Sequence, residues 1–129
     1  YGFREPLQRF ASSGMPMWGT CAGMIMLASK ITESDPIPLG LMDIEVQRNA
    51  FGRQIDSFEQ MLPLKGVADA FNCIFIRAPV VLKTGTDVDI IAKLEDETPI
   101  AVQQGKLLAT SFHPELSNDA RVHKYFLDL

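Results

Sequence analysis

The feature that most constrains the fold is a cysteine set between two glycines, where a short apolar stretch gives way to a helical pattern. Residues 17–24 read MWGTCAGM and contain the form G-x-C-x-G. In this motif a strand turns sharply into a helix, and Gly19 and Gly23 would remove the Cβ atoms that crowd the strained turn. The motif predicts a strand, a projecting Cys21 thiol and a helix in succession. On this motif alone, a buried cysteine beside a tight turn stays open as the alternative.

The rest of the chain combines helical and strand patterns, as expected for an α/β domain. Apolar residues at helical spacing predict helices over 3–13, 22–31 and 117–129, the last capped by Ser117 or Asn118. Strand patterns occupy 15–19, 43–49, 72–78 and 106–112, and a hairpin is predicted from 87–96 and 99–104. We expect one domain over residues 1–129 that is incomplete at its N-terminus, because the chain opens at Tyr1 with a segment typical of a domain interior.

Composition limits the classes of partner. The formal net charge is −4 and basic residues do not cluster, which argues against nucleic-acid binding. The apolar runs fall short of the roughly 20 residues needed to span a bilayer, so we expect no membrane association and a cytoplasmic protein. Cys21 and Cys73 are interpreted as reduced thiols, and neither has the spacing of a metal ligand, so no metal is expected.

A histidine and a carboxylate two residues apart could complete a catalytic group with the cysteine. The segment Ser-Phe-His-Pro-Glu-Leu places His113 and Glu115 on either side of Pro114. If this segment is extended, both side chains project to one side, and Glu115 can orient the imidazole. Cysteine, histidine and carboxylate then have the roles of nucleophile, base and orienting group. Taken alone, His113 would be interpreted as an ordinary loop histidine beside a proline that ends a strand. His123 is assigned a solvated or helix-packing role.

The predicted turn has two chemical consequences for Cys21. A helix N-terminus has unpaired amides and a positive dipole end, which would lower the pKa of the thiol. The amide of Ala22, the next residue, would point at an oxyanion formed on a carbonyl that Cys21 attacks.

The motifs together resemble a known family. GTCAG followed by SFHPEL is similar to the class I, triad-type glutamine amidotransferases, and QRNAFGRQIDSFE, FIRAP and SFHPELS narrow the resemblance to the glutaminase subunits of pyridoxal 5'-phosphate synthase. The resemblance implies a flavodoxin-like fold, with a largely parallel sheet and helices on both faces. It also implies a glycine-rich G-G-E-S loop and opening sheet strands upstream of the residues in this sequence.

The resemblance implies a reaction and its residues. L-glutamine would be hydrolysed to L-glutamate and ammonia through a thioester on Cys21, with His113 as base and Glu115 as its partner. The glutamine contacts of the family fall on three residues, Arg48, Ile76 and Arg77. For the two arginines, an ordinary surface ion pair is the alternative reading.

The resemblance also implies a partner. Ammonia would pass to a synthase subunit in a hetero-oligomer, and pyridoxal 5'-phosphate would be the product of that complex rather than a cofactor bound here. Two alternatives stay open: a glutaminase serving another acceptor, such as imidazole glycerol phosphate synthase, and a non-catalytic partner-binding subunit.

Overall fold

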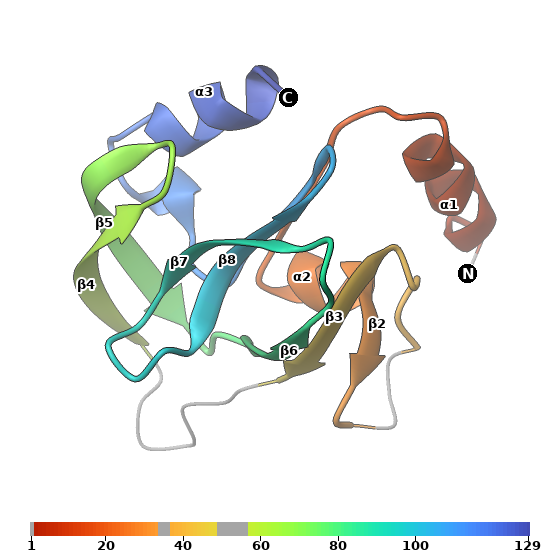
Figure 1. Ribbon diagram of the computed structural model, residues 1–129, viewed down its shortest axis with the longest axis horizontal. Coiled ribbons are helices and arrows are strands. Elements are labelled where there is room, and N and C mark those ends of the chain that lie inside the picture. Colours follow the sequence, from red (N-terminus) through yellow and green to blue (C-terminus); the bar gives the residue numbers. More distant parts are fainter. Residues whose placement is uncertain (1, 34–36, 49–56) are drawn as a thin grey trace.

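The described chain consists mostly of strands, with one helix near each end and another after the first strand (Figure 1). The structure is a computed structural model that describes residues 2–33, 37–48 and 57–129. The described residues form helices α1 (Arg4–Ser12), α2 (Ala22–Leu27) and α3 (Arg121–Leu127) and the 3₁₀ turn η1 (Pro114–Leu116). Their strands are β1 (Met17–Thr20), β2 (Ala28–Ile31), β3 (Met42–Gln47), β4 (Ser57–Leu64), β5 (Ala68–Ile76), β6 (Val80–Thr84), β7 (Asp89–Lys93), β8 (Pro99–Gln104) and β9 (Leu107–Thr110). The predicted α/β class is confirmed.

The strands pair in mixed directions. One sheet has the order β1–β9–β8–β7, in which β1 lies parallel to β9 and the other two pairings are antiparallel. The predicted β7–β8 hairpin is therefore confirmed. A second sheet, β2–β3–β6, has one parallel and one antiparallel pairing, and β4 and β5 form an antiparallel hairpin. The expectation of a largely parallel sheet needs correction, because short turns rather than crossover helices join β4 to β5, β7 to β8 and β8 to β9.

Helices cover both faces of the sheet that contains β1 and β9, as expected. Side chains alternate between the two faces along each strand. Trp18 and Leu108 contribute to a core that includes Val122 of α3. Met17 and Ala109 pack in a second core with residues of α2 on the opposite face. The turn after β1 therefore lies between two packed layers.

The prediction of a helix over 22–31 is wrong in its second half. α2 ends at Leu27, and the following residues form β2, which lies parallel to β3. The Ser29 hydroxyl donates a hydrogen bond to the Met42 carbonyl, while Ala28 and Ile31 are buried. Tertiary pairing with β3 thus decides the conformation, because an apolar run of this length indicates burial without distinguishing helix from strand.

Two strands, β4 and β6, occupy segments where the sequence pattern predicts none. β4 contains Pro63, and β6 follows Pro79 directly. Proline lowers the expectation of a strand because it cannot donate to the ladder. The β4–β5 ladder accommodates Pro63 through a register shift between Leu62 and Leu64.

The two terminal helices are present where expected but differ in detail. α1 stops before Gly14, which has a positive φ of 84°, and it contains no buried residue. α3 begins at Arg121, so Ser117 or Asn118 as its cap is wrong. The main-chain N–H of Arg121 instead donates to the carboxylate of Asp119 at 3.0 Å.

Candidate active site

Cys21 lies on a sharp turn between β1 and α2. Its φ of 49° is positive, as the prediction of a strained turn requires, and its N–H donates to the Thr110 carbonyl at 2.8 Å. A Cβ atom on Gly19 would lie 2.5 Å from the carbonyl carbon of Gly23, whereas one on Gly23 would have no neighbour within 4 Å. The predicted need for glycine therefore holds for Gly19 and is wrong for Gly23.

Cys21, His113 and Glu115 form a hydrogen-bonded chain. The Cys21 Sγ lies 2.9 Å from His113 Nε2 and also donates to the Ser111 carbonyl at 3.0 Å. His113 Nδ1 lies 2.7 Å from Glu115 Oε2. The His113 side chain is 22% exposed and that of Glu115 is 48% exposed, so this series of hydrogen-bonded side chains extends from the interior toward solvent. Its geometry allows the thiol proton to pass to an imidazole that a carboxylate orients.

The backbone that presents His113 is not extended, contrary to the prediction. Residues 114–116 form η1, and the Leu116 N–H donates to the His113 carbonyl at 3.2 Å. Pro114 at the first position suits such a turn, since its φ is preset and it has no N–H to satisfy. The His113 N–H donates to the Ile74 carbonyl of β5 at 2.8 Å, which attaches the turn to the β4–β5 hairpin.

The pKa of the Cys21 thiol is raised, so the prediction of a lowered pKa is wrong. Burial, and after it the negative charge of Glu115, raises this pKa to about 12. α2, which begins directly after Cys21, has only six residues. With this pKa, the Cys21 thiol is protonated at neutral pH.

Three further groups around the site could not be assigned from their own motifs. The Ser111 carbonyl accepts a hydrogen bond from the Cys21 thiol, and the Trp18 indole N–H donates one to Thr110 Oγ1 at 3.1 Å. His123, interpreted from the sequence as a packing or solvated residue, lies edge-on against Trp18 with ring centroids 5.0 Å apart. The period-two pattern of β1 and β9 gives Trp18 its face, but the position of His123 depends on how α3 packs.

Arg48, Ile76 and Arg77 follow or end strands. The main-chain N–H of Arg48, just after β3, donates to Glu33 Oε1 at 3.3 Å, and the charge of Arg48 contributes to holding the pKa of Glu33 below its usual value, behind the larger effect of Thr32. Ile76 ends β5 and is 40% exposed. Arg77 follows with a positive φ of 46°. The strand end is close to His113 through the Ile74 carbonyl, while the motif residues 49–56 lie outside the described part of the chain.

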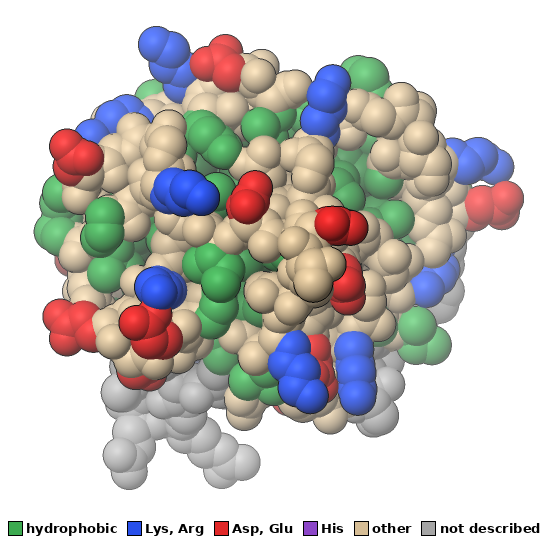
Figure 2. Space-filling view, in the orientation of Figure 1, with side chains coloured by type: hydrophobic (Ala, Val, Ile, Leu, Met, Phe, Trp, Pro, Cys, Tyr) green, Lys and Arg blue, Asp and Glu red, His purple; other side chains and the backbone are tan. Residues whose placement is uncertain are grey.

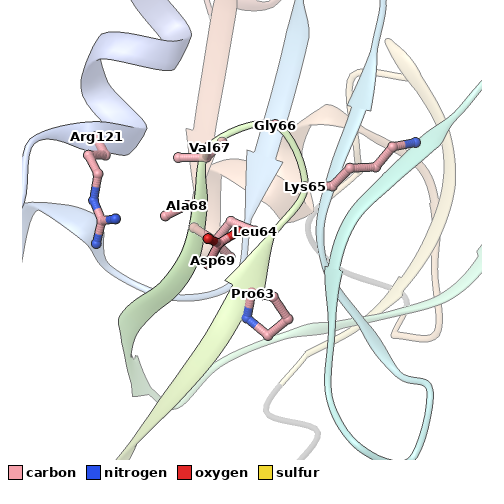
Figure 3. A pocket seen from close by; sticks show the side chains of 8 residues that line it. All are labelled: Pro63, Leu64, Lys65, Gly66, Val67, Ala68, Asp69 and Arg121. Atoms are coloured by element: carbon pink, nitrogen blue, oxygen red, sulfur yellow. The ribbon is translucent and has the colours of Figure 1, made fainter.

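One pocket of the described residues lies away from the site. It has a volume of about 490 Å³ and lies between the β4–β5 turn and α3, where Arg121 points toward the hairpin and Lys65 points away (Figure 3). A smaller pocket of about 340 Å³ is lined by both Glu115 and His123, and so touches the hydrogen-bonded chain. On the face seen in Figure 2, acidic and basic side chains are interspersed over the described surface.

The described residues lack two other kinds of feature. They contain no group of three or more His, Cys, Asp or Glu side chains arranged to hold a metal ion. In the same residues, no helix is long and apolar enough to cross a membrane.

Comparison with known sequences gives a consistent family. A family model described as the SNO glutamine amidotransferase family matches residues 1–129. A protein named pyridoxal 5'-phosphate synthase subunit PdxT from Dehalococcoides mccartyi (strain CBDB1) is 56% identical over 132 residues, covering 100% of this chain and 68% of the relative. The protein of the same name from Anoxybacillus flavithermus (strain DSM 21510 / WK1) is 55% identical over 129 residues, covering 100% and 67%.

Solved structures agree in fold. A crystal structure of a glutamine amidotransferase superposes with a TM-score of 0.92 at 44% identity, covering 99% of this chain and 68% of the other. A glutamine amidotransferase from Thermotoga maritima gives a TM-score of 0.63 at 15% identity, over 97% of this chain and 50% of the other, which is a likeness of fold alone.

Proposed function

Because this chain belongs to the SNO glutamine amidotransferase family, we propose that it hydrolyses L-glutamine to L-glutamate and ammonia and delivers the ammonia for pyridoxal 5'-phosphate synthesis. The hydrogen-bonded chain from the Cys21 thiol through His113 to Glu115 is the observation that carries the proposal. The relatives described above are named as subunits of that synthase. These names favour it over imidazole glycerol phosphate synthase as the acceptor, and membership in a family of enzymes disfavours a purely non-catalytic role.

In the first half of the reaction, Cys21 Sγ attacks the side-chain amide carbon of glutamine while its proton passes to His113 Nε2, 2.9 Å away. A carbon–sulfur bond forms and the carbonyl oxygen becomes an oxyanion. The Ala22 N–H donates to this oxyanion, since amides at the first position of a helix lack an intrahelical partner. His113 then gives its proton to the amide nitrogen, the carbon–nitrogen bond breaks, and ammonia leaves a γ-glutamyl thioester.

In the second half, water resolves the thioester. His113 Nε2 takes a proton from the attacking water, the carbon–sulfur bond breaks, and the proton returns to sulfur to restore the thiol. Glu115 Oε2 accepts a hydrogen bond from His113 Nδ1 throughout. This bond keeps Nε2 directed at Cys21 and stabilises the imidazolium that forms in each half.

Arg48, Ile76 and Arg77 hold the substrate in this proposal. An arginine guanidinium can bind the α-carboxylate of glutamine through paired charge-assisted hydrogen bonds. The main chain of Ile76 and Arg77 can pair with the substrate because β5 ends there, two residues beyond the carbonyl that receives the His113 N–H. The positive φ at Arg77 gives this strand end a conformation that functional sites often retain.

The remaining parts of the proposal concern the setting of the reaction. A synthase subunit in a hetero-oligomer receives the ammonia, and pyridoxal 5'-phosphate is made there. This chain itself uses neither a cofactor nor a metal, because thiol, imidazole and carboxylate supply the nucleophile, the proton transfer and the orientation. The cytoplasm is the proposed location.

The test is the variant Cys21→Ala, assayed for glutamate release in the presence of the synthase subunit. We expect glutaminase activity to be lost, while synthesis of pyridoxal 5'-phosphate by the complex continues when ammonium salt replaces glutamine. A glutamine-analogue electrophile should label the unsubstituted protein once, at Cys21, as measured by intact mass and peptide mapping. Full glutamine turnover by Cys21→Ala would contradict the proposal.

A further inference from the structure

A second histidine lies beside the carboxylate of the site. His123, on α3, lines the pocket of about 340 Å³ together with Glu115 and loop residues 117–120. Partial burial acts to raise the pKa of Glu115, but the hydrogen bond from His113 and the charges of His113 and His123 hold it below its ordinary value. Glu115 thus interacts with two imidazoles, one through a hydrogen bond and the other through charge.

The same strand that leads to Cys21 holds His123 in place. The His123 ring meets the Trp18 ring edge-on, at an interplanar angle of 76°. Trp18 is fixed in turn by its hydrogen bond to Thr110 Oγ1, and the Thr110 carbonyl receives the Cys21 N–H. β1 and β9 therefore position the nucleophile and the second imidazole together.

The other charges around His123 are few and are partly compensated. Asp119 lines the same pocket, but its carboxylate accepts hydrogen bonds from Arg121 Nε at 2.9 Å. Lys124 is the next residue of α3 and is exposed. From β1 the packed residue is the uncharged Trp18, and from η1 it is the anionic Glu115. The pairing of Asp119 with Arg121 makes Glu115 the main anion for a charged His123.

We propose that His123 is a positioning residue for this reaction: held edge-on by Trp18, its imidazole lines the same pocket as Glu115, and its charge sets how strongly Glu115 stabilises protonated His113. The inference rests on the proposed function, because it concerns the same proton acceptor. His113 must be unprotonated to accept the Cys21 proton. A positive charge on His123 weakens the electrostatic stabilisation of the His113 imidazolium by Glu115. His113 therefore remains unprotonated, and able to accept the Cys21 proton, at lower pH. Histidine suits this role because its charge ordinarily changes between pH 5 and 8.

The test uses two variants that change the charge of His123 in opposite ways. In the intact protein, nuclear magnetic resonance follows the titration of the His113 ring, and the acid limb of kcat/KM for glutamine is measured with the synthase subunit. His123→Gln removes the charge and should raise the His113 midpoint by about 0.3 pH unit; His123→Lys makes the charge permanent and should lower it by a similar amount. Lys124→Gln, the matched control, removes a charge from outside the pocket lining and should leave the midpoint unchanged.

The order of the His113 titration midpoints in the variants tests the inference. The inference is supported if the His113 midpoint lies higher in His123→Gln than in the unsubstituted protein and lower in His123→Lys. The acid limb of kcat/KM should shift in the same direction as the midpoint in each variant. Midpoints that stay together, that move in the same direction in both variants, or that respond equally to Lys124→Gln overturn the inference. The titration needs no turnover, so an inactive unsubstituted protein would contradict the proposed function, whereas an active protein with unmoved midpoints would contradict only the role of His123.

Discussion

The backbone of Cys21 has a positive φ of 49°, a conformation that costs a non-glycine residue on the order of 1–3 kcal/mol. The hydrogen bond from its N–H to Thr110 and the close approach of Gly19 to Gly23 hold the turn in this conformation. The turn aims the thiol at His113 rather than lowering its pKa. In the proposed mechanism, activation of the thiol therefore depends on proton transfer from Cys21 to His113.

Gly19 and Gly23 lie two residues before and two residues after Cys21, and substitution by alanine should change stability in opposite directions at the two positions. Gly19→Ala forces a Cβ to within 2.5 Å of the Gly23 main chain and should lower the free energy of unfolding by about 2 kcal/mol. Gly23→Ala meets open space in a helix and should raise it by about 0.5–1 kcal/mol. Urea unfolding of both variants measures the difference, and equal destabilisation would show that the crowding at Gly19 is not specific.

At this scale the sequence was sufficient to place the residues whose positions depend on local structure. G-x-C-x-G placed Cys21 on a turn, and the spacing of His113 and Glu115 predicted that the two would meet, although through a 3₁₀ turn rather than an extended segment. The raised pKa of Cys21 could not be predicted from the motif, because burial is a tertiary property. The same holds for His123, whose neighbours depend on the packing of α3 against β1.

At the level of the elements, the β4–β5 hairpin contacts the segment that presents His113. The Ile74 carbonyl of β5 receives the His113 N–H, and Phe75 packs edge-on against Phe112, the residue before His113, with centroids 6.0 Å apart. Phe75 also stacks on Phe58 of β4 at 4.5 Å. The hairpin thus packs against the segment that presents His113. One of its two strands, β4, was not predicted from the sequence, because Pro63 interrupts the strand pattern.

Truncating the aromatic contact should disturb the base as well as the stability. Phe75 is 0% exposed, and Phe75→Ala should cost about 3–5 kcal/mol of unfolding free energy. At temperatures where the variant remains folded, its glutaminase kcat should also fall, because Phe112 and His113 lose their support. Ile44→Ala is the matched control: it should cost about 2–5 kcal/mol but lower kcat less, because the core that contains Ile44 does not include Phe112. Equal kcat in the two variants would contradict a positioning role for the hairpin.

For the whole molecule, two apolar cores on opposite faces of the β1–β9 pair decide where the turn sits. The class of fold and the two helix-covered faces could be predicted from periodicity and from the resemblance to a family. The mixed strand directions could not, since local patterns do not state which strands pair. The core next to α3 also contains Cys73, whose fully buried thiol packs there and donates a long hydrogen bond to the Phe71 carbonyl at 3.6 Å.

The buried thiol of Cys73 makes the stability of the molecule sensitive to alkaline pH. Burial raises its pKa from 9.0 to about 12, so the unfolded chain loses this proton first as the pH rises. Its contribution is therefore fully present below about pH 9 and is lost progressively toward pH 12, by at most about 1.4 kcal/mol per pH unit.

Cys73→Ala should lower the unfolding free energy by roughly 1 kcal/mol at neutral pH, because a small cavity forms. It should also flatten the fall in stability between about pH 9 and about pH 10.5, because no thiol remains at this position to ionise on unfolding. Urea unfolding across that range measures both effects, and other groups that titrate there contribute equally to the two proteins. Parallel slopes would mean that the Cys73 thiol reaches water in the native state, and that the core beneath α3 opens without global unfolding.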